Sequence, residues 1–393
     1  MSTNKKKSLI IWVSTVALSI ILIIIGNRYF TKGLDILNYG DATVKARVVS
    51  LGERISDAYD AGALYENNVQ YFDAEIISGE KKGQTVTAIQ TSDNYTNMNE
   101  RDVCVGDKVI LYQMDESVVD YEWLFGSYAR FDYMLVFGLI FFALLLVFGK
   151  IKGLNTIISL SFTCLSVFGV FVPSVLHGTN IYFMTAVICI YTIVMTLLLT
   201  NGATEKSFTT MLGCSFGVAV AALLSVMFDR MMKLTGILDE HTVYLQYLGS
   251  DGVSINLNGL IFAMIVIGAM GAVMDVAMDI SSSLYEVHRH ANHLSFRELF
   301  KSGIRIGQDV MGTMANTLVL AYIGSSLCSV LLLISYSSSL LELLNRENIV
   351  VEIMQSLVGS TAILLTIPLT SVICGILYTN KDRKKEIPED SLH

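Results

Sequence analysis

The sequence predicts an α-helical polytopic membrane protein with about eight transmembrane helices and a small extracytoplasmic β-barrel of the OB or SH3-like kind between the first and second helices. Hydrophobic residues make up 53% of the 393 residues and charged residues only 16%, whereas soluble domains carry about 25% charged residues. A spanning helix needs about 17 to 25 apolar residues. Eight segments have this length, at residues 9–25, 133–149, 154–173, 181–200, 208–228, 259–280, 313–336 and 357–378.

These segments lack the alternation of barrel strands, so we expect them to be helices that satisfy their own backbone hydrogen bonds. The first follows three lysines, Lys5, Lys6 and Lys7. A secretory signal has the same basic start, but this apolar stretch is long for a signal and no A-x-A site follows it. We therefore favour an uncleaved anchor.

The distribution of Lys and Arg predicts the orientation. Basic residues lie before the first span, between the second and third, between the fourth and fifth, in the long loop after the sixth, and in the tail. Cytoplasmic loops carry this excess, so both termini are expected in the cytoplasm of a plasma-membrane protein. The expected parts are an anchor (1–26), an extracytoplasmic β-rich domain (27–132), a seven-helix transmembrane domain (133–380) and a cytoplasmic tail (381–393).

The β-rich domain is read from short alternating segments. Residues 43–53, 69–78, 84–91 and 106–113 have strand patterns, and Gly79 to Gly83 has the composition of a hairpin loop. The domain holds 18 acidic and 10 basic residues, which accounts for the whole net charge of −8. An acidic outer domain argues against nucleic acid as a partner.

An acidic pair marks the sixth span. Asp275 and Asp279 are four residues apart and so share one helix face, with Gly268 and Gly271 one to two turns earlier. Small residues let a neighbouring helix pack closely, and carboxylates within a membrane usually face a cavity, a partner or a cation. The simpler interpretation is that the pair ends its helix at the inner membrane surface, where water reaches it.

A second polar stripe opens the seventh span. Ser295 and Glu298 form a capping box that predicts a short helix, and Gly303 is expected to interrupt it. Asp309, Asn316 and Thr313 then share a stripe, with Gly307 and Gly312 as packing positions. If this stripe faced Asp275, Asp279 and Ser281, it would form an oxygen-rich site for Mg²⁺, Mn²⁺, Na⁺ or a proton, with Asp275 and Asp279 as the metal ligands. For Thr313 and Asn316, ordinary hydrogen bonding between helices explains the pattern equally well.

Three histidines, His288, His290 and His293, follow the acidic pair. Their spacing does not place three ligands on one helix face, and Arg289 beside them opposes a cation. We favour surface histidines over a metal or pH-sensing site.

Two motifs resemble those of a known family. The runs Gly271-Ala-Val-Met-Asp-Val-Ala-Met-Asp279 and Gly307-Gln-Asp-Val-Met-Gly-Thr-Met-Ala-Asn-Thr-Leu318 look like the signature of YibE/F-like bacterial membrane proteins. The resemblance extends over most of the chain, including the anchor and the outer domain. It implies a bacterial plasma-membrane protein and specifies no activity.

Three functions remain open from the sequence. The leading hypothesis is a secondary transporter or permease for a small solute or ion, because acids and small residues cluster within apolar helices. No Walker motif is present to use ATP. The alternatives are a sensor or scaffold whose outer domain binds a partner, and a Mg²⁺-dependent intramembrane enzyme, for which Asp309 alone would have to serve as the second acidic motif. Beyond the lipid bilayer, a homo-oligomer or a partner membrane protein is expected.

Overall fold

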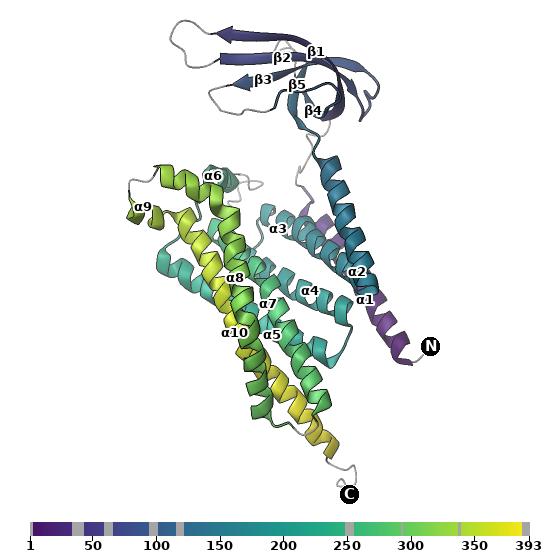
Figure 1. Cartoon of the computed structure of the whole chain (residues 1–393), viewed down its shortest axis with the longest axis vertical. Coiled ribbons are helices and arrows are strands. Elements are labelled where there is room, and N and C mark those ends of the chain that lie inside the picture. The colour runs from purple at the N-terminus through teal and green to yellow at the C-terminus, as the bar shows by residue number, and fades with distance from the viewer. Residues whose placement is uncertain are drawn as a thin grey trace. The chain divides into compact units, whose positions relative to one another are not determined.

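The computed structural model describes residues 3–33, 43–58, 66–93, 101–114, 122–247, 255–291, 294–336 and 339–386. The chain divides into two compact units (Figure 1). One unit is Asp35–Leu144, and the other combines Met1–Leu34 with Leu145–His393. The protein is mostly helical, and one unit contains a small barrel.

The first unit contains a closed five-stranded barrel, as the sequence predicts. Its strands run in the order β1-β2-β3-β5-β4, with β4 paired back to β1. The β3–β5 pair is parallel and the other pairs are antiparallel. The strands are β1 (Thr43–Ala58), β2 (Glu66–Ile76), β3 (Thr85–Asp93), β4 (Lys108–Gln113) and β5 (Trp123–Tyr128).

Alternating side chains fill the barrel core. Val48, Phe72, Leu111 and Trp123 are buried inside it. The hairpin loop predicted from Gly79 to Gly83 joins β2 to β3, and both terminal glycines adopt positive φ angles, which other residues rarely tolerate. The alternation of the sequence therefore located four strands, whereas β5 was not recognised.

A single carboxylate links three strands of the barrel. The Ser50 hydroxyl on β1 donates to one Asp73 oxygen at 2.7 Å, and the Thr87 hydroxyl on β3 donates to the other at 2.8 Å. These bonds stabilise the charged form. The Ser50 bond first and the Thr87 bond second hold the pKa of Asp73 below its usual value of 3.8.

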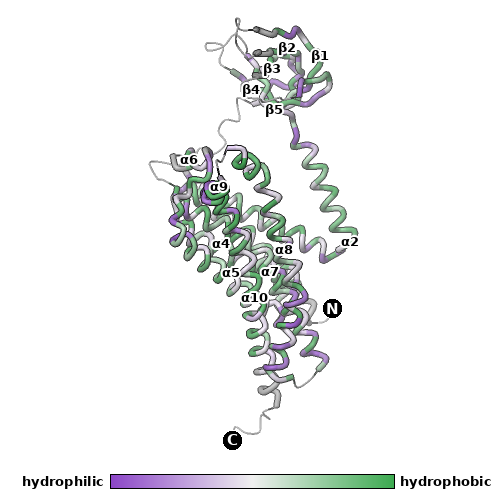
Figure 2. Tube along the Cα trace, turned by 60° about the vertical axis from the view of Figure 1, so that its left-hand side comes forward, coloured by the Kyte–Doolittle hydropathy of each residue, from purple (hydrophilic) through white to green (hydrophobic). Residues whose placement is uncertain are grey.

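The helices of the chain are mainly hydrophobic along their length (Figure 2). Among the described residues, seven helical segments are long and apolar enough to cross a membrane. The helical elements are α1 (Thr3–Phe30), α2 (Phe131–Ser166), the π-helical turn η2 (Val167–Phe171), α3 (Val172–Leu176), α4 (Ile181–Asn201), α5 (Glu205–Met232), α6 (Glu240–Tyr247), α7 (Leu257–His290), α8 (Phe296–Tyr336), α9 (Leu340–Asn345) and α10 (Glu347–Glu386).

The second of the seven apolar segments contains two of the eight predicted spans. It runs over Phe131–Leu176, 46 residues, which is about 69 Å of helix against a hydrocarbon core of about 30 Å. The helix is broken inside this segment at Lys150, whose φ is 49° and ψ is −125°. Gly153 then approaches the Leu145 carbonyl so closely that no Cβ would fit. The break lies between the predicted spans 133–149 and 154–173.

Helix α10 packs against α5, α7 and α8, and glycines on two of these helices make the close approach. Both α5 and α8 carry a G-x-x-x-G pair, in which small residues let helix backbones come near. On each glycine of the two pairs, an added Cβ would overlap a side chain of α10. The contacts are Gly213 with Thr370, Gly217 with Thr366, Gly303 with Ser371, and Gly307 with Ile367.

The expected interruption at Gly303 is wrong. The capping box of Ser295 and Glu298 does form, with the Ser295 amide donating to the Glu298 carboxylate at 2.8 Å. The helix that follows runs without a break from Phe296 to Tyr336. Gly303 does not end the helix. Because glycine has no side chain, Ser371 of α10 can pack directly against this position.

The first prediction concerns the G-x-x-x-G pair of α5. In Gly217→Ala, the added methyl group meets Thr366 on one side and Val273 on the other. We expect overpacking to lower the free energy of unfolding by about 1–3 kcal/mol, measured by thermal unfolding of the purified protein in detergent. Gly271→Ala is the matched control, because no atom lies within 4 Å of the added group. Equal stability of the two variants would contradict the packing of α10.

The second prediction concerns the pH dependence of the barrel. Because the folded-state pKa of Asp73 is lowered, its stabilising contribution is complete above about pH 3.8 and is lost as the pH falls through the folded pKa. We expect Ser50→Ala with Thr87→Ala to destabilise the barrel at neutral pH, and the difference from the parent to shrink below pH 3.8. Fluorescence of Trp123 in a Trp12→Phe background measures this; a difference that does not change with pH would contradict it.

Candidate functional site

One face of α7 carries the predicted acidic pair. Met264, Gly268, Gly271, Asp275 and Asp279 are all exposed and recur every three or four residues, so they form one continuous stripe. We call these five positions the acidic stripe. The other faces of α7 are packed: Val273, Val276, Ala277 and Ile280 are fully buried.

The carboxylates of this stripe have no hydrogen-bond or ion-pair partner among the described residues. Across the part of the chain that the structure describes, no hydrogen bond or ion pair reaches Asp275 or Asp279, and none reaches Asp309. In the same described ranges, no three His, Cys, Asp or Glu side chains gather closely enough to hold a metal ion. The pair itself therefore supplies two oxygen-bearing groups one turn apart.

The polar stripe of α8 lies away from the contact with α10. Asp309, Thr313 and Asn316 are exposed, about half a helical turn from Gly307, which contacts Ile367. The Thr313 hydroxyl donates to the Val310 carbonyl of its own helix at 2.9 Å. Where α7 and α8 meet, the contact is apolar and includes Val276 and residues such as Val310, Met314 and Leu318.

The remaining predicted residues occupy different environments. Gly268 lies against the hydroxyl of Tyr322 on α8, whereas Gly271 and Gly312 have no atom within 4 Å of an added Cβ. Ser281 is fully buried and shares a short hydrogen bond with Thr210 of α5. Ser281 therefore faces α5 and not the acidic stripe.

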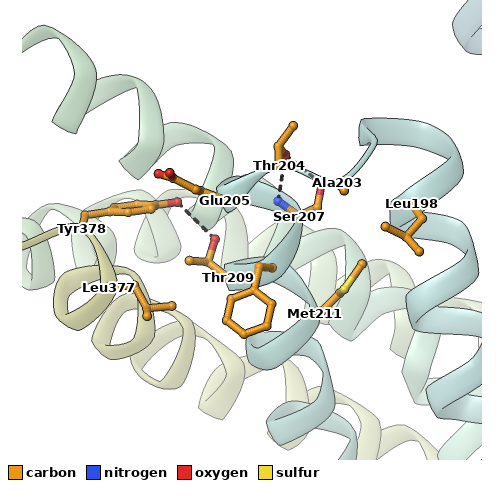
Figure 3. A pocket seen from close by; sticks show the side chains of 10 residues that line it. Leu198, Ala203, Thr204, Glu205, Ser207, Thr209, Met211, Leu377 and Tyr378 are labelled. Carbon is orange, nitrogen blue, oxygen red and sulfur yellow. Dashed lines mark hydrogen bonds between the residues drawn. The ribbon is translucent and has the colours of Figure 1, made fainter. Parts of the chain in front are cut away.

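A polar cluster joins α5, α7 and α10 near the α4–α5 connection. Thr209 and Tyr378 are buried, and their hydroxyls lie 3.1 Å apart and point toward each other (Figure 3). Thr210 and Ser281 make the next hydroxyl pair. The Lys206 ammonium donates to the Ser282 hydroxyl, which is three residues beyond Asp279. A cation of α5 thus lies close to the end of the acidic stripe.

A pocket of about 390 Å³ opens beside this cluster. Its polar lining includes Thr204, Glu205, Thr209 and Tyr378, and its apolar walls include Leu198, Met211 and Leu377 (Figure 3). The Thr204 side chain also caps α5 by accepting from the Ser207 amide at 3.1 Å. The sequence signals for this cluster are adjacent hydroxyl residues in apolar helices, Thr209 with Thr210 and Ser282 beside Ser281. Of these four, only Ser281 was predicted as a site residue.

The histidines at the end of α7 divide between two roles. His288 stacks on Tyr378, with ring centroids 5.3 Å apart. His290 is exposed, and its Nδ1 lies 2.9 Å from the Glu286 carbonyl. The third member of the expected trio, His293, lies outside the described residues.

Comparison with known proteins identifies a family. The family of YibE/F-like proteins matches residues 137–380, which is more than half of the chain and includes α4, α5, α7, α8 and most of α10. No curated protein and no solved structure matches the chain. The matched region contains both the acidic stripe and the polar cluster.

The third prediction tests the contact between α5 and α10 in the polar cluster. In a double-mutant cycle, Thr209→Val and Tyr378→Phe should show a coupling free energy of about 0.5–1.5 kcal/mol, because their buried hydroxyls bond to each other. Thermal unfolding in detergent supplies the four stabilities. Tyr285→Phe is the control partner for Thr209→Val, since Tyr285 also packs against the ring of Tyr378 but, among the described residues, has no hydrogen bond to Thr209. Additive effects for Thr209 and Tyr378 would contradict the bond.

Proposed function

The chain belongs to the YibE/F-like family, and we propose that it is a secondary transporter or permease of the bacterial plasma membrane whose path for a cation or proton follows the acidic stripe of α7. One observation carries this proposal. Asp275 and Asp279 are exposed, and no described residue pairs with them, on a helix that is otherwise long and apolar enough to cross a membrane.

Placing these carboxylates within a bilayer costs free energy unless their helix face contacts water or a bound ligand. Insertion of a single Asp at the centre of a spanning helix costs about 3 kcal/mol, and two carboxylates one turn apart also repel each other. A water-filled path or a bound cation removes both costs. The same stripe contains Gly271, where no atom lies within 4 Å of an added Cβ, which leaves room beside the carboxylates.

The charges around the stripe limit the extent of the proposed cation path. The Lys206 ammonium is bonded to Ser282 at the end of the stripe, where it opposes a second positive charge. Asp309 and Asn316 of α8 are exposed and are available to line the path. In the proposed topology both termini are cytoplasmic, which places Lys206 at the cytoplasmic end, in agreement with the preference of cytoplasmic loops for basic residues.

A second function is favoured by the barrel. The five strands close on themselves around their own core within a compact unit. Small barrels of the OB kind commonly bind ligands on one face. A membrane sensor or scaffold would use this unit to bind an extracytoplasmic partner. Such a protein would not need carboxylates on the open face of α7.

The fourth prediction tests the acidic stripe. Purified protein is reconstituted in vesicles, and proton flux is followed with an internal pH dye while Na⁺, Mg²⁺ or Mn²⁺ is supplied outside. Asp275→Asn with Asp279→Asn should lower the flux about tenfold or more, because charge-assisted binding is lost. The Asn side chains keep the shape of the helix face.

The control is Glu286→Gln, which removes another exposed carboxylate of α7 and should leave flux unchanged. A double Asp variant that transports like the parent would overturn the transport path and favour the sensor. Single variants show whether one carboxylate suffices.

A further inference from the structure

A second cavity lies between α8, α9 and α10, and neither Asp275 nor Asp279 is among its lining residues. It encloses about 450 Å³, within the range of pockets that hold small organic ligands. Apolar side chains dominate its lining. The principal ones are Ile323, Leu327, Val330, Leu344, Ile353 and Leu357.

One carboxylate is set into this apolar lining. Glu352 of α10 lines the cavity, and its Oε2 atom is buried without a hydrogen-bond partner among the described residues. Tyr322, Ser326 and Ser356 also line it, but the Ser326 hydroxyl is already bonded to the Tyr322 carbonyl at 2.8 Å. The cavity therefore presents one unsatisfied acceptor that carries negative charge when ionised.

The lining provides no positive charge to balance Glu352. None of the lining residues is Lys, Arg or His. The nearby Arg346 forms an ion pair with Glu342, with 3.0 Å between nitrogen and oxygen. Glu352 is half-buried, but its buried Oε2 has neither a cation nor a donor beside it, which is unfavourable, so a ligand that brings a positive charge gains more here than a neutral ligand of the same shape.

The carboxylate of Glu352, in a lining that includes no Lys, Arg or His, restricts the class of ligand. A phospholipid headgroup would bring a phosphate beside Glu352, and the lining offers that phosphate no cation. A purely apolar molecule would fill the walls and leave Oε2 unpaired. We propose that this cavity is a binding site for a free amphiphilic amine, with its ammonium group donating to Glu352 and its apolar body against α8 and α10. This proposal does not depend on the transport path.

The fifth prediction uses two fluorescent probes with the same dansyl group and linker: dansylcadaverine, which carries a primary ammonium, and its N-acetyl derivative, whose terminal amide is neutral. The full-length protein is placed in phosphatidylcholine nanodiscs and titrated with each probe. We expect saturable binding of dansylcadaverine that is about tenfold or more tighter than that of the neutral probe. Glu352→Gln should abolish this preference and leave the thermal unfolding midpoint close to that of the parent.

Two further variants separate charge from shape. Ser356→Leu, which fills the cavity, should weaken binding of both probes, and Glu286→Gln, outside the cavity, should change neither. Equal binding of the two probes to the parent, unchanged preference in Glu352→Gln, or no saturable binding of dansylcadaverine would overturn the proposal. Displacement of the probe by phosphatidylethanolamine in the nanodisc would also overturn it, by assigning the cavity to a lipid headgroup.

Discussion

The close approach of α10 to its neighbours is the constraint on which the helical unit depends. Lipid provides no hydrophobic drive for helices to associate, so tight packing and small residues must provide it. Two G-x-x-x-G pairs, at Gly213 and Gly217 on α5 and at Gly303 and Gly307 on α8, receive side chains of α10. The buried Thr366 and Ser371 of α10 meet these glycines while bonding to carbonyls of their own helix. Thr366 and Ser371 thus fill close contacts without leaving their hydroxyls unpaired.

This packing also determines which face of α7 remains open. Helices α4, α5, α8 and α10 all contact α7, and they cover the faces that carry Val273, Val276 and Ala277. The uncovered face is the one with Asp275 and Asp279. Positions that conflict with their surroundings are where function is expected, and here the conflict is between two unpaired carboxylates and a membrane-spanning helix. The proposed path resolves it by giving the carboxylates water or a cation.

Periodicity made much of the fold predictable. Apolar length located the helices, strand alternation located β1 to β4, and the capping box of Ser295 and Glu298 located the start of α8. Prediction failed at a glycine, because a glycine in a helix can either interrupt it or let a neighbouring helix pack closely. Gly303 was interpreted as a helix breaker, but in α8 it serves close packing against Ser371. The segment Phe131–Leu176 was divided by its apolar lengths into two spans, 133–149 and 154–173, and the break at Lys150 lies between them.

The sequence by itself determined the class of protein, the helices, most of the barrel and the shared face of Asp275 and Asp279, because these depend on local length, periodicity and spacing. Only the tertiary structure decided which faces are covered. It exposed the acidic stripe, turned Ser281 toward Thr210, and brought Thr209 to Tyr378 and Glu352 into an apolar cavity. These contacts join residues up to 169 positions apart, and which helices become neighbours depends on how whole surfaces pack together, which local patterns do not encode.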